Sequence, residues 1–264
     1  MHGAGLRRLI HPSALVDPGA ELDSSVEVGP FAVIGAGVEI DAGTRIGPHA
    51  VLRGPMRIGR DNRIFQFASV GEDPQDKKYS GEPTRLEMGD RNQVREFVTL
   101  HRGTVQDQGV TRIGDDNLFM AYTHVAHDCR IGNQVILANA ASLGGHVEIQ
   151  DWAILGGFTI VHQFCRIGAH AFCAMGSVLT RDVPPYVTVG GHPAEPHGIN
   201  SEGLKRRGFS PEAIRAIKRA YRALYMANLK LDEARAQIAE MAVDTPELRP
   251  LLDFISAAGR GLAR

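Results

Sequence analysis

The residues of this sequence that could carry chemistry are mainly histidines, because an imidazole takes up or releases a proton near neutral pH. The chain has 11 histidines. Three of them, His127, His146 and His162, recur at intervals close to 18 residues, and His124 stands just before the first. A chain that returned to the same side at that interval would stack the three imidazoles in one column, with coils about 4.8 Å apart.

Three roles are compatible with such a column. One histidine could act as a general base while its neighbours bind substrate. Three neutral imidazoles could instead bind zinc, although Asp128 and Gln163 stand among them without a compact set of further carboxylates. Surface histidines without a role are the third explanation, which the clustering makes the weakest.

Other candidates for chemistry carry less weight. We expect solvated or structural roles for histidines that have no companion in the sequence: His2, His11, His49, His170 and His197. The cysteines form no CxxC pair, and packing is their expected role: Cys129, Cys165 and Cys173. No P-loop or dinucleotide-binding glycine motif occurs in a strand–turn–helix context.

A six-residue repeat must position these side chains. Every sixth residue is aliphatic from Ile10 to Val70 and, in the same phase, apolar from Met88 to Leu100. After a shift of one residue, the repeat continues from Ile113 to Leu179. This period fits a short strand with a tight corner, and three such units make one coil of a parallel β-helix. A β-sandwich with regular turns would not keep one phase over this length.

Two polar segments, residues 72–87 and 102–112, interrupt the repeat. Both contain glycine and charged residues, and the first also contains proline, a composition typical of loops at the surface. We expect both loops to be extruded from the coils. A β-helix without a binding function would not need them, so they favour a site nearby.

Helical patterns follow the end of the repeat. Helices are expected to begin at Pro211, where a serine and a proline supply the N-cap and first position, and then near Leu231 and at Thr245. The sequence therefore predicts two domains. A hexapeptide-repeat β-helix covers residues 1–199, and a small C-terminal α-helical domain covers residues 200–264.

Composition and charge exclude several classes of function. Lys and Arg total 29 against 30 Asp and Glu, so the net charge of -1 lacks the basic surplus of a general nucleic-acid-binding protein. No apolar run reaches the roughly 18 residues of a membrane span, and the N-terminus lacks a signal-peptide core. With three cysteines that suit reduced thiols, a cytoplasmic location is expected.

Several segments together are specific enough to indicate a family. The hexads with HVAHDC, GGHV, VHQF, DVPPYV and INSEGLKRRGF resemble the UDP-N-acetylglucosamine acyltransferases of lipid A biosynthesis, over nearly the whole chain. The resemblance implies a left-handed β-helix, a homotrimer, and active sites in clefts between neighbouring subunits. It also implies the first step of lipid A biosynthesis, in which an R-3-hydroxyacyl group moves from acyl carrier protein to the 3-hydroxyl of UDP-N-acetylglucosamine.

The resemblance assigns roles to individual residues. His127 would be the general base, Asp128 would orient it, and the backbone N–H of Gly145 would bind the oxyanion. Contacts to sugar, diphosphate or acyl chain would come from Gln75, Asp76, Lys78, His101, His124, His146, His162 and Gln163. The nucleotide would be held by Asn200, Glu202, Arg206 and Arg207. Because a thioester is already activated, this reaction needs no metal, no cofactor and no covalent intermediate.

One departure from the family predicts the length of the acyl chain. Where several members carry glycine, this chain has Met175. This residue stands close to three coils beyond His127, or roughly 13 Å along the prism at about 4.8 Å per coil. That distance matches a ten-carbon chain, so we expect a preference for a 3-hydroxydecanoyl-like donor over a 14-carbon donor.

Alternative functions stay open from the residues alone. Another hexapeptide acyltransferase would use acyl-CoA and a different acceptor, a γ-type carbonic anhydrase would bind zinc, and a scaffold would need its histidines only for stability. A basic stretch between Gly203 and Ala223 contains a single acid, Glu212. It suits either a solvated helix face or an acidic partner, and a carrier protein and a diphosphate favour the partner.

Overall fold

The structure, a computed structural model, describes residues 9–257 and 260–263. The remaining residues of the two predicted domains, His2 among them, lie outside this description. The described chain forms two compact units, the first ending at Asp128 and the second beginning at Cys129.

The first unit consists of short strands in three parallel sheets, and each strand pairs with the strand three places further along the chain. One sheet contains β1 (Leu15–Val16), β4 (Val33–Ile34), β7 (Val51–Leu52), β10 (Ser69–Glu72), β13 (Thr99–His101) and β16 (His124–Val125). The second contains β2 (Glu21–Leu22), β5 (Val38–Ile40), β8 (Met56–Ile58), β11 (Arg85–Met88) and β14 (Val110–Ile113). The third contains β3 (Glu27–Val28), β6 (Arg45–Ile46), β9 (Arg63–Ile64), β12 (Gln93–Val94) and β15 (Leu118–Phe119).

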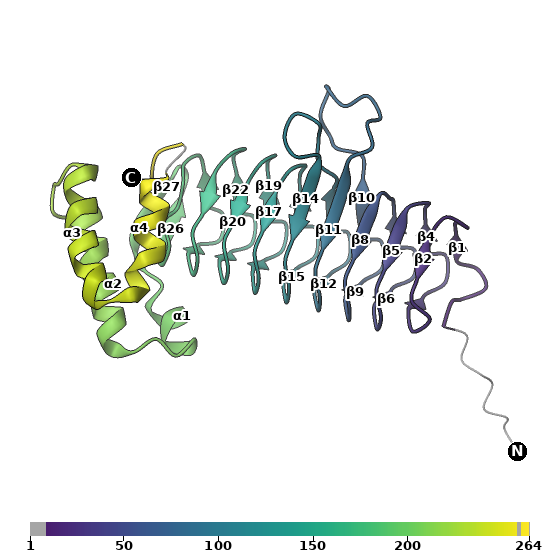
Figure 1. The fold of residues 1–264 in the computed structure, drawn as a ribbon, viewed down its shortest axis with the longest axis horizontal. Helices are drawn as coiled ribbons and strands as arrows, with labels where there is room; N and C mark the ends of the chain where they lie inside the picture. The colour runs from purple at the N-terminus through teal and green to yellow at the C-terminus, as the bar shows by residue number, and fades with distance from the viewer. Residues whose placement is uncertain (1–8, 258–259, 264) are drawn as a thin grey trace, which may run out of the picture. The chain divides into compact units, whose positions relative to one another are not determined.

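The hexad residues of this unit form its core. Ile34 pairs with Leu52, and Leu52 pairs with Val70 on the following coil, and none of the three is more than 1% exposed. Each strand therefore turns one aliphatic side chain inward and stacks it on the same position of the next coil. Figure 1 shows the successive coils of short strands. Parallel pairing at this spacing confirms the predicted β-helix and does not occur in an antiparallel β-sandwich.

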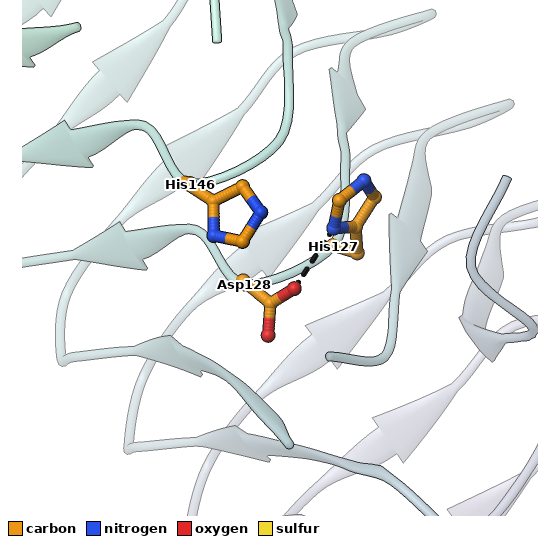
Figure 2. A group of neighbouring side chains, drawn as sticks. All are labelled: His127, Asp128 and His146. Carbon is orange, nitrogen blue, oxygen red and sulfur yellow. Dashed lines mark hydrogen bonds and ion pairs between the residues drawn. The ribbon is translucent and has the colours of Figure 1, made fainter. Parts of the chain in front are cut away.

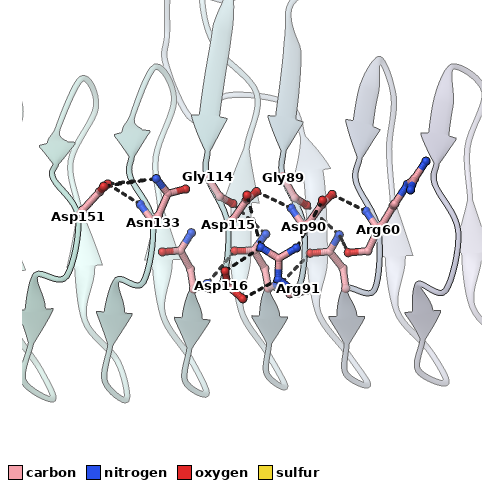
Figure 3. A network of polar contacts seen from close by, with 12 residues as sticks. Arg60, Gly89, Asp90, Arg91, Gly114, Asp115, Asp116, Asn133 and Asp151 are labelled. Carbon is pink, nitrogen blue, oxygen red and sulfur yellow. Dashed lines mark hydrogen bonds and ion pairs between the residues drawn. The ribbon is translucent and has the colours of Figure 1, made fainter. Parts of the chain in front are cut away.

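Polar contacts close one row of corners in the first unit (Figure 3). Outside the coil, the Asp90 carboxylate accepts the Arg60 N–H at 2.7 Å, and Asp115 accepts the Asp90 N–H at 2.8 Å. Arg91 donates two hydrogen bonds of 2.8 Å to Asp116. Inside the coil, buried asparagines accept backbone N–H groups from the next coil: Asn62 from Asn92 at 2.8 Å and Asn92 from Asn117 at 3.0 Å. These contacts satisfy corner N–H groups that strand pairing does not reach.

Both predicted loops project from the coils of the first unit (Figure 1). The loop between β10 and β11 comprises residues 73–84, and the loop between β13 and β14 comprises residues 102–109. Each is shorter than the predicted segment, because strand pairing extends into the polar residues. Glu87, for example, pairs with Arg57 on one side and Arg112 on the other.

The second unit begins with coils of the same kind. One sheet contains β17 (Arg130–Ile131), β20 (Glu148–Ile149) and β23 (Arg166–Ile167), and another contains β19 (Ser142–Leu143), β22 (Ile160–Val161) and β25 (Val178–Leu179). The third contains β18 (Ile136–Leu137), β21 (Ile154–Leu155), β24 (Phe172–Cys173), β26 (Val187–Gly191) and β27 (Ala194–Ile199). The last two strands form an antiparallel hairpin that ends the coils.

Helices complete the second unit: α1 (Ser201–Arg206), α2 (Pro211–Tyr225), α3 (Leu231–Asp244), the 3-10 turn η1 (Pro246–Leu248) and α4 (Arg249–Ser256). The predicted starts at Pro211 and Leu231 are confirmed, and the Ser210 hydroxyl accepts the Ala213 N–H at 3.1 Å as the N-cap. The third predicted helix is divided into η1 and α4, and α1 was not predicted. The predicted domain boundary lies between β27 and α1.

A separate core joins the helices to the last coil. Tyr186, from the turn before β26, packs with Leu224, Ile238 and Phe254 of three different helices. Its hydroxyl donates a hydrogen bond of 2.6 Å to the carbonyl of Glu247. Among the helices of the described residues, none combines the length and the apolar character that a membrane crossing requires.

Candidate active site

His127 and Asp128 lie in the corner that follows β16, at the end of the first unit. Asp128 has a φ of 59°, a left-handed conformation that aspartate tolerates better than most residues. Its side chain is 1% exposed and that of His127 is 13% exposed. The His127 Nδ1–H donates to the Asp128 carboxylate at 2.8 Å, and Figure 2 shows this bond. Because a carboxylate only accepts, Nε2 of a neutral His127 carries the lone pair of a base.

Two threonines that the sequence reasoning did not single out bind Asp128. The Thr104 N–H and hydroxyl donate to the two carboxylate oxygens at 2.9 and 2.6 Å, and the Asp128 N–H donates to the Thr111 hydroxyl at 2.8 Å. Thr104 comes from the loop of residues 102–109. The interruption of the repeat was the only signal in the sequence that this loop belongs to the site.

Two further predicted histidines meet in the same unit. The rings of His101 and His124 lie edge to face with centroids 5.2 Å apart, and Nδ1 of His124 lies 2.8 Å from the Thr99 hydroxyl. Burial, followed by the charges of His101 and His127, lowers the pKa of His124 to about 4. His124 is therefore neutral at pH 7, and it can serve as a neutral hydrogen-bonding group there.

His101 is 4% exposed, and its Nδ1 donates to the carbonyl of Asp73 at 2.6 Å. Within the described residues its Nε2 is buried and has no hydrogen-bond partner. The next residue, Arg102, pairs with the Asp73 carboxylate and donates to the Tyr79 hydroxyl at 3.0 Å. These contacts fix the loop of residues 73–84 to the coils.

Three predicted substrate-binding residues lie on that loop. Gln75 and Lys78 are exposed, and Asp76 is half-buried. The Asp76 carboxylate accepts the backbone N–H of Lys78 at 2.9 Å, which leaves the Lys78 ammonium at the surface. The loop therefore presents an amide and a cation to solvent.

Gly145 and His146 follow β19 in the second unit (Figure 2 labels His146). Gly145 is buried, and its carbonyl accepts the Phe164 N–H at 3.0 Å. Among the described residues, no acceptor for the Gly145 N–H is found. The same repeat position after β1 is occupied by Pro18, which has no N–H. Pairing within a coil therefore does not use this N–H group.

The two predicted histidines of the second unit make different contacts. The ring of His146 stacks on Phe164 with centroids 4.4 Å apart. His162 is exposed, and its Nδ1 lies 3.1 Å from the carbonyl of Gln163, which is also exposed. The two histidines stand three and one residues after Leu143 and Val161, which pair on adjacent coils.

The predicted nucleotide-binding residues divide into two pairs. Asn200 caps α1 by accepting the Gly203 N–H at 3.1 Å, and its amide donates to the His170 carbonyl at 3.0 Å. The Arg207 guanidinium lies 3.3 Å from His170 Nδ1 and 5.0 Å above the Trp152 ring, and burial lowers its pKa. Both residues bind the chain itself.

The second pair faces solvent. Glu202 is exposed and forms an ion pair of 2.7 Å with Lys205, which holds the pKa of Glu202 below its usual range. Arg206 is also exposed. These two side chains are accessible to a ligand.

Met175 follows β24 and is 76% exposed. It lies 48 residues after His127 in the sequence, which is not a whole number of 18-residue coils. In the second unit it therefore follows a strand of a different sheet than Gly145 and Gln163 do. Phe158 and Ile160 of the same unit are also exposed, at 65% and 53%.

Known proteins resemble this chain in sequence and in fold. The family model described as "Udp N-acetylglucosamine O-acyltransferase; Domain 2" matches residues 182–263, and the bacterial transferase hexapeptide model matches residues 19–54 and 111–145. The acyl-[acyl-carrier-protein]--UDP-N-acetylglucosamine O-acyltransferase of Janthinobacterium sp. (strain Marseille) is 60% identical over 260 residues, covering 97% of this chain and 99% of its own. The protein of the same name from Halorhodospira halophila is 62% identical over 255 residues, with the same coverage.

A solved structure agrees with these relatives. The UDP-N-acetylglucosamine acyltransferase of Francisella novicida superimposes with a TM-score of 0.95 at 44% identity, covering 97% of this chain and 94% of its own. The fold class is thereby confirmed as a left-handed parallel β-helix with a small C-terminal helical part. The chain belongs to the family of acyl-[acyl-carrier-protein]–UDP-N-acetylglucosamine O-acyltransferases.

Proposed function

We propose that this protein transfers an R-3-hydroxyacyl group from acyl carrier protein to the 3-hydroxyl of UDP-N-acetylglucosamine, as the first step of lipid A biosynthesis, with His127 as general base. The hydrogen bond between His127 Nδ1 and the buried Asp128 carboxylate carries the proposal. It supports a fixed tautomer whose Nε2 accepts a proton. The names of relatives at about 60% identity support the substrates.

The reaction follows from this tautomer. His127 Nε2 takes the proton of the sugar 3-hydroxyl while the oxygen of this hydroxyl attacks the thioester carbonyl. The Asp128 carboxylate stabilises the imidazolium that forms. The Gly145 N–H, which the coil does not use, would donate to the oxyanion. When the C–S bond breaks, the imidazolium returns its proton to the thiolate of the carrier. The step therefore leaves an ester and a thiol, and His127 is neutral again.

Substrate roles follow from which side chains are accessible. We propose that Gln75, Asp76 and Lys78 on the projecting loop contact the diphosphate side, since an exposed ammonium suits a phosphate. His101, His124, His146, His162 and Gln163 would contact the sugar and the acyl chain. Glu202 and Arg206 would contact the nucleotide, whereas Asn200 and Arg207 would act by holding α1.

We further propose that Met175 limits the acyl chain to about ten carbons. Its exposed thioether and the exposed Phe158 and Ile160 support an apolar surface for a chain. Met175→Gly would remove the obstruction, so transfer of the fourteen-carbon donor should rise relative to the ten-carbon donor. If the order of donors is unchanged in Met175→Gly, the residue has no part in chain length.

The proposed assembly is a homotrimer in the cytoplasm that binds the acidic carrier protein. Exposed Lys218, Arg219 and Arg222 on α2 support an acidic partner. In the first unit, five rings stack at centroid distances of 4.9–5.2 Å along one row of corners: Phe31, His49, Phe67, Phe97 and Tyr122. Contact with another copy would cover such apolar rings. Three buried cysteines, free of disulfides, suit a reducing compartment.

The first experiment measures acyl transfer to UDP-N-acetylglucosamine from 3-hydroxyacyl carrier proteins of ten, twelve and fourteen carbons, with the wild type and His127→Ala. Transfer that depends on His127 supports the reaction, and an optimum at ten carbons supports the role of Met175. Transfer from acyl-CoA to another acceptor would indicate a different acyltransferase. No transfer from any donor would overturn the proposal and direct attention to zinc and carbonic anhydrase activity.

A further inference from the structure

We propose that Thr104, on the loop between β13 and β14, is a positioning residue for His127 that acts through Asp128. The inference rests on the proposed function, in which His127 is the base, and names a residue that neither the sequence motifs nor the family names assign. Thr104 is 1% exposed, so it does not contact substrate from the surface.

Thr104 binds both oxygens of the Asp128 carboxylate. Its N–H donates to Oδ1 at 2.9 Å, and its hydroxyl donates to Oδ2 at 2.6 Å. The same Oδ2 accepts His127 Nδ1–H at 2.8 Å. Two donors from one residue fix the plane of the carboxylate, and this plane sets the direction in which His127 Nδ1 is held.

The surroundings keep bulk water away from the carboxylate. Asp128 is 2% exposed, so bulk water does not replace a lost hydrogen bond. Its backbone is held separately, because the Asp128 N–H donates to Thr111 at 2.8 Å. Removal of the Thr104 hydroxyl would therefore leave the corner in place and take from the carboxylate the donor that shares Oδ2 with His127.

Thr104 is itself fixed by its loop. Its carbonyl accepts the Gly109 N–H at 3.0 Å, which closes the loop on itself. The preceding Gly103 donates to the Arg85 carbonyl at 3.2 Å, and a Cβ there would lie 2.2 Å from the Val110 nitrogen. Glycine at 103 thus permits the close approach that brings Thr104 to Asp128. The loop therefore places a rigid pair of donors behind the base.

A loosened carboxylate should slow proton transfer without weakening substrate binding. We expect Thr104→Val, which keeps the shape of the side chain, to lower kcat by about 10- to 100-fold, as for misplacement of a catalytic group. KM for UDP-N-acetylglucosamine should stay within about twofold, since the substrate contacts are unchanged. Thr104→Ser retains the hydroxyl and should restore most of kcat.

Thr44→Val is the matched control. Thr44 is also fully buried in the first unit, where its hydroxyl donates to the Gly59 carbonyl at 2.9 Å and accepts the Asn62 N–H at 3.1 Å. This control loses buried hydrogen bonds of the same kind, so its melting temperature should fall, but its kcat should not. A merely structural role of Thr104 would make the two variants alike.

A double-mutant cycle with Asp128→Asn tests the route of the effect. If Thr104 acts through Asp128, Thr104→Val should add little to the loss in Asp128→Asn. Full additivity, or a Thr104→Val variant within twofold of wild-type kcat, would overturn the inference. Thr104→Ala makes the same test if the valine variant is too unstable to assay. Absence of transfer by the wild type would instead overturn the proposed function.

Discussion

Each unit contains a half-buried histidine, and the two histidines have different neighbours. His124 in the first unit and His170 in the second both have a pKa lowered to about 4, chiefly by burial. His124 has polar neighbours: its ring lies within hydrogen-bond distance of the Thr99 hydroxyl and edge to face with His101, and the charge of His127 contributes to its lowered pKa. A lowered pKa therefore does not distinguish the two environments.

His170 lies among aromatic rings instead. It stacks between Trp152 and Tyr186 at 6.3 and 5.7 Å, and Phe209 meets it edge to face at 5.1 Å. The Arg207 guanidinium beside it is the second cause of its lowered pKa. No carboxylate in the described structure hydrogen-bonds to its ring. The neighbours of a histidine, rather than its burial or pKa, therefore distinguish a histidine beside the proposed base from one packed among the rings of the core.

The largest expected difference between the two histidine environments concerns catalysis. His127→Gln should lower kcat by about 10²- to 10⁴-fold, the usual contribution of a general base. His170→Gln should leave kcat nearly unchanged, because its neighbours are rings of the structural core. Steady-state kinetics of both variants, with circular dichroism to verify folding, make the measurement. A large loss of kcat in His170→Gln would erase the distinction drawn here.

The pH dependence of stability should be shared by both units. A histidine with a folded pKa near 4 and an ordinary unfolded value near 6.5 binds more protons when unfolded, so stability is lost as pH falls through this window. Allowing for partial exposure, each group should cost roughly 1 to 2 kcal/mol between pH 7 and pH 5. Denaturant unfolding of His124→Gln and His170→Gln should each show a pH dependence weaker than that of the wild type by roughly this amount. Unaltered dependence in either variant would show that its imidazole is not buried neutral.

The smallest expected effect concerns the attachment of α1. Arg207→Lys keeps the charge but loses the flat guanidinium over Trp152 and its contact with His170, which should cost about 1 kcal/mol. Arg206→Lys, at an exposed neighbouring position, is the control and should cost almost nothing. Equal melting temperatures for the two variants would mean that the stack around His170 contributes little to the second unit.

Much of the fold could be predicted from the sequence because the repeat is local. Inward residues such as Ile34 and Leu52 need only a fixed spacing, and capping at Ser210 and Pro211 is likewise decided by neighbours in the chain. The helix α1 was missed because it is short and polar. It is held by contacts to His170, which lies far away in the sequence.

The candidate site was only partly predictable, because some of its contacts join residues that are far apart in the sequence. His127 and Asp128 are adjacent, so a motif exposes them together. Thr104 lies 24 residues before Asp128 and reaches it only because its loop folds back onto the coil, and no repeat specifies how a loop folds. For His146 and His162, counting residues gave their coils, but their contacts with Phe164 and with the carbonyl of Gln163 could not be counted from the sequence.

The backbone N–H of Gly145, for which the described residues offer no acceptor, has a consequence for genetics. A backbone donor can seldom be deleted by mutation, because every residue but proline carries one and proline usually breaks the surrounding structure. Here the scaffold already carries proline at the equivalent place, at Pro18. Evolution can therefore switch such a donor on or off, coil by coil, with a single codon and without redesigning the architecture that carries it.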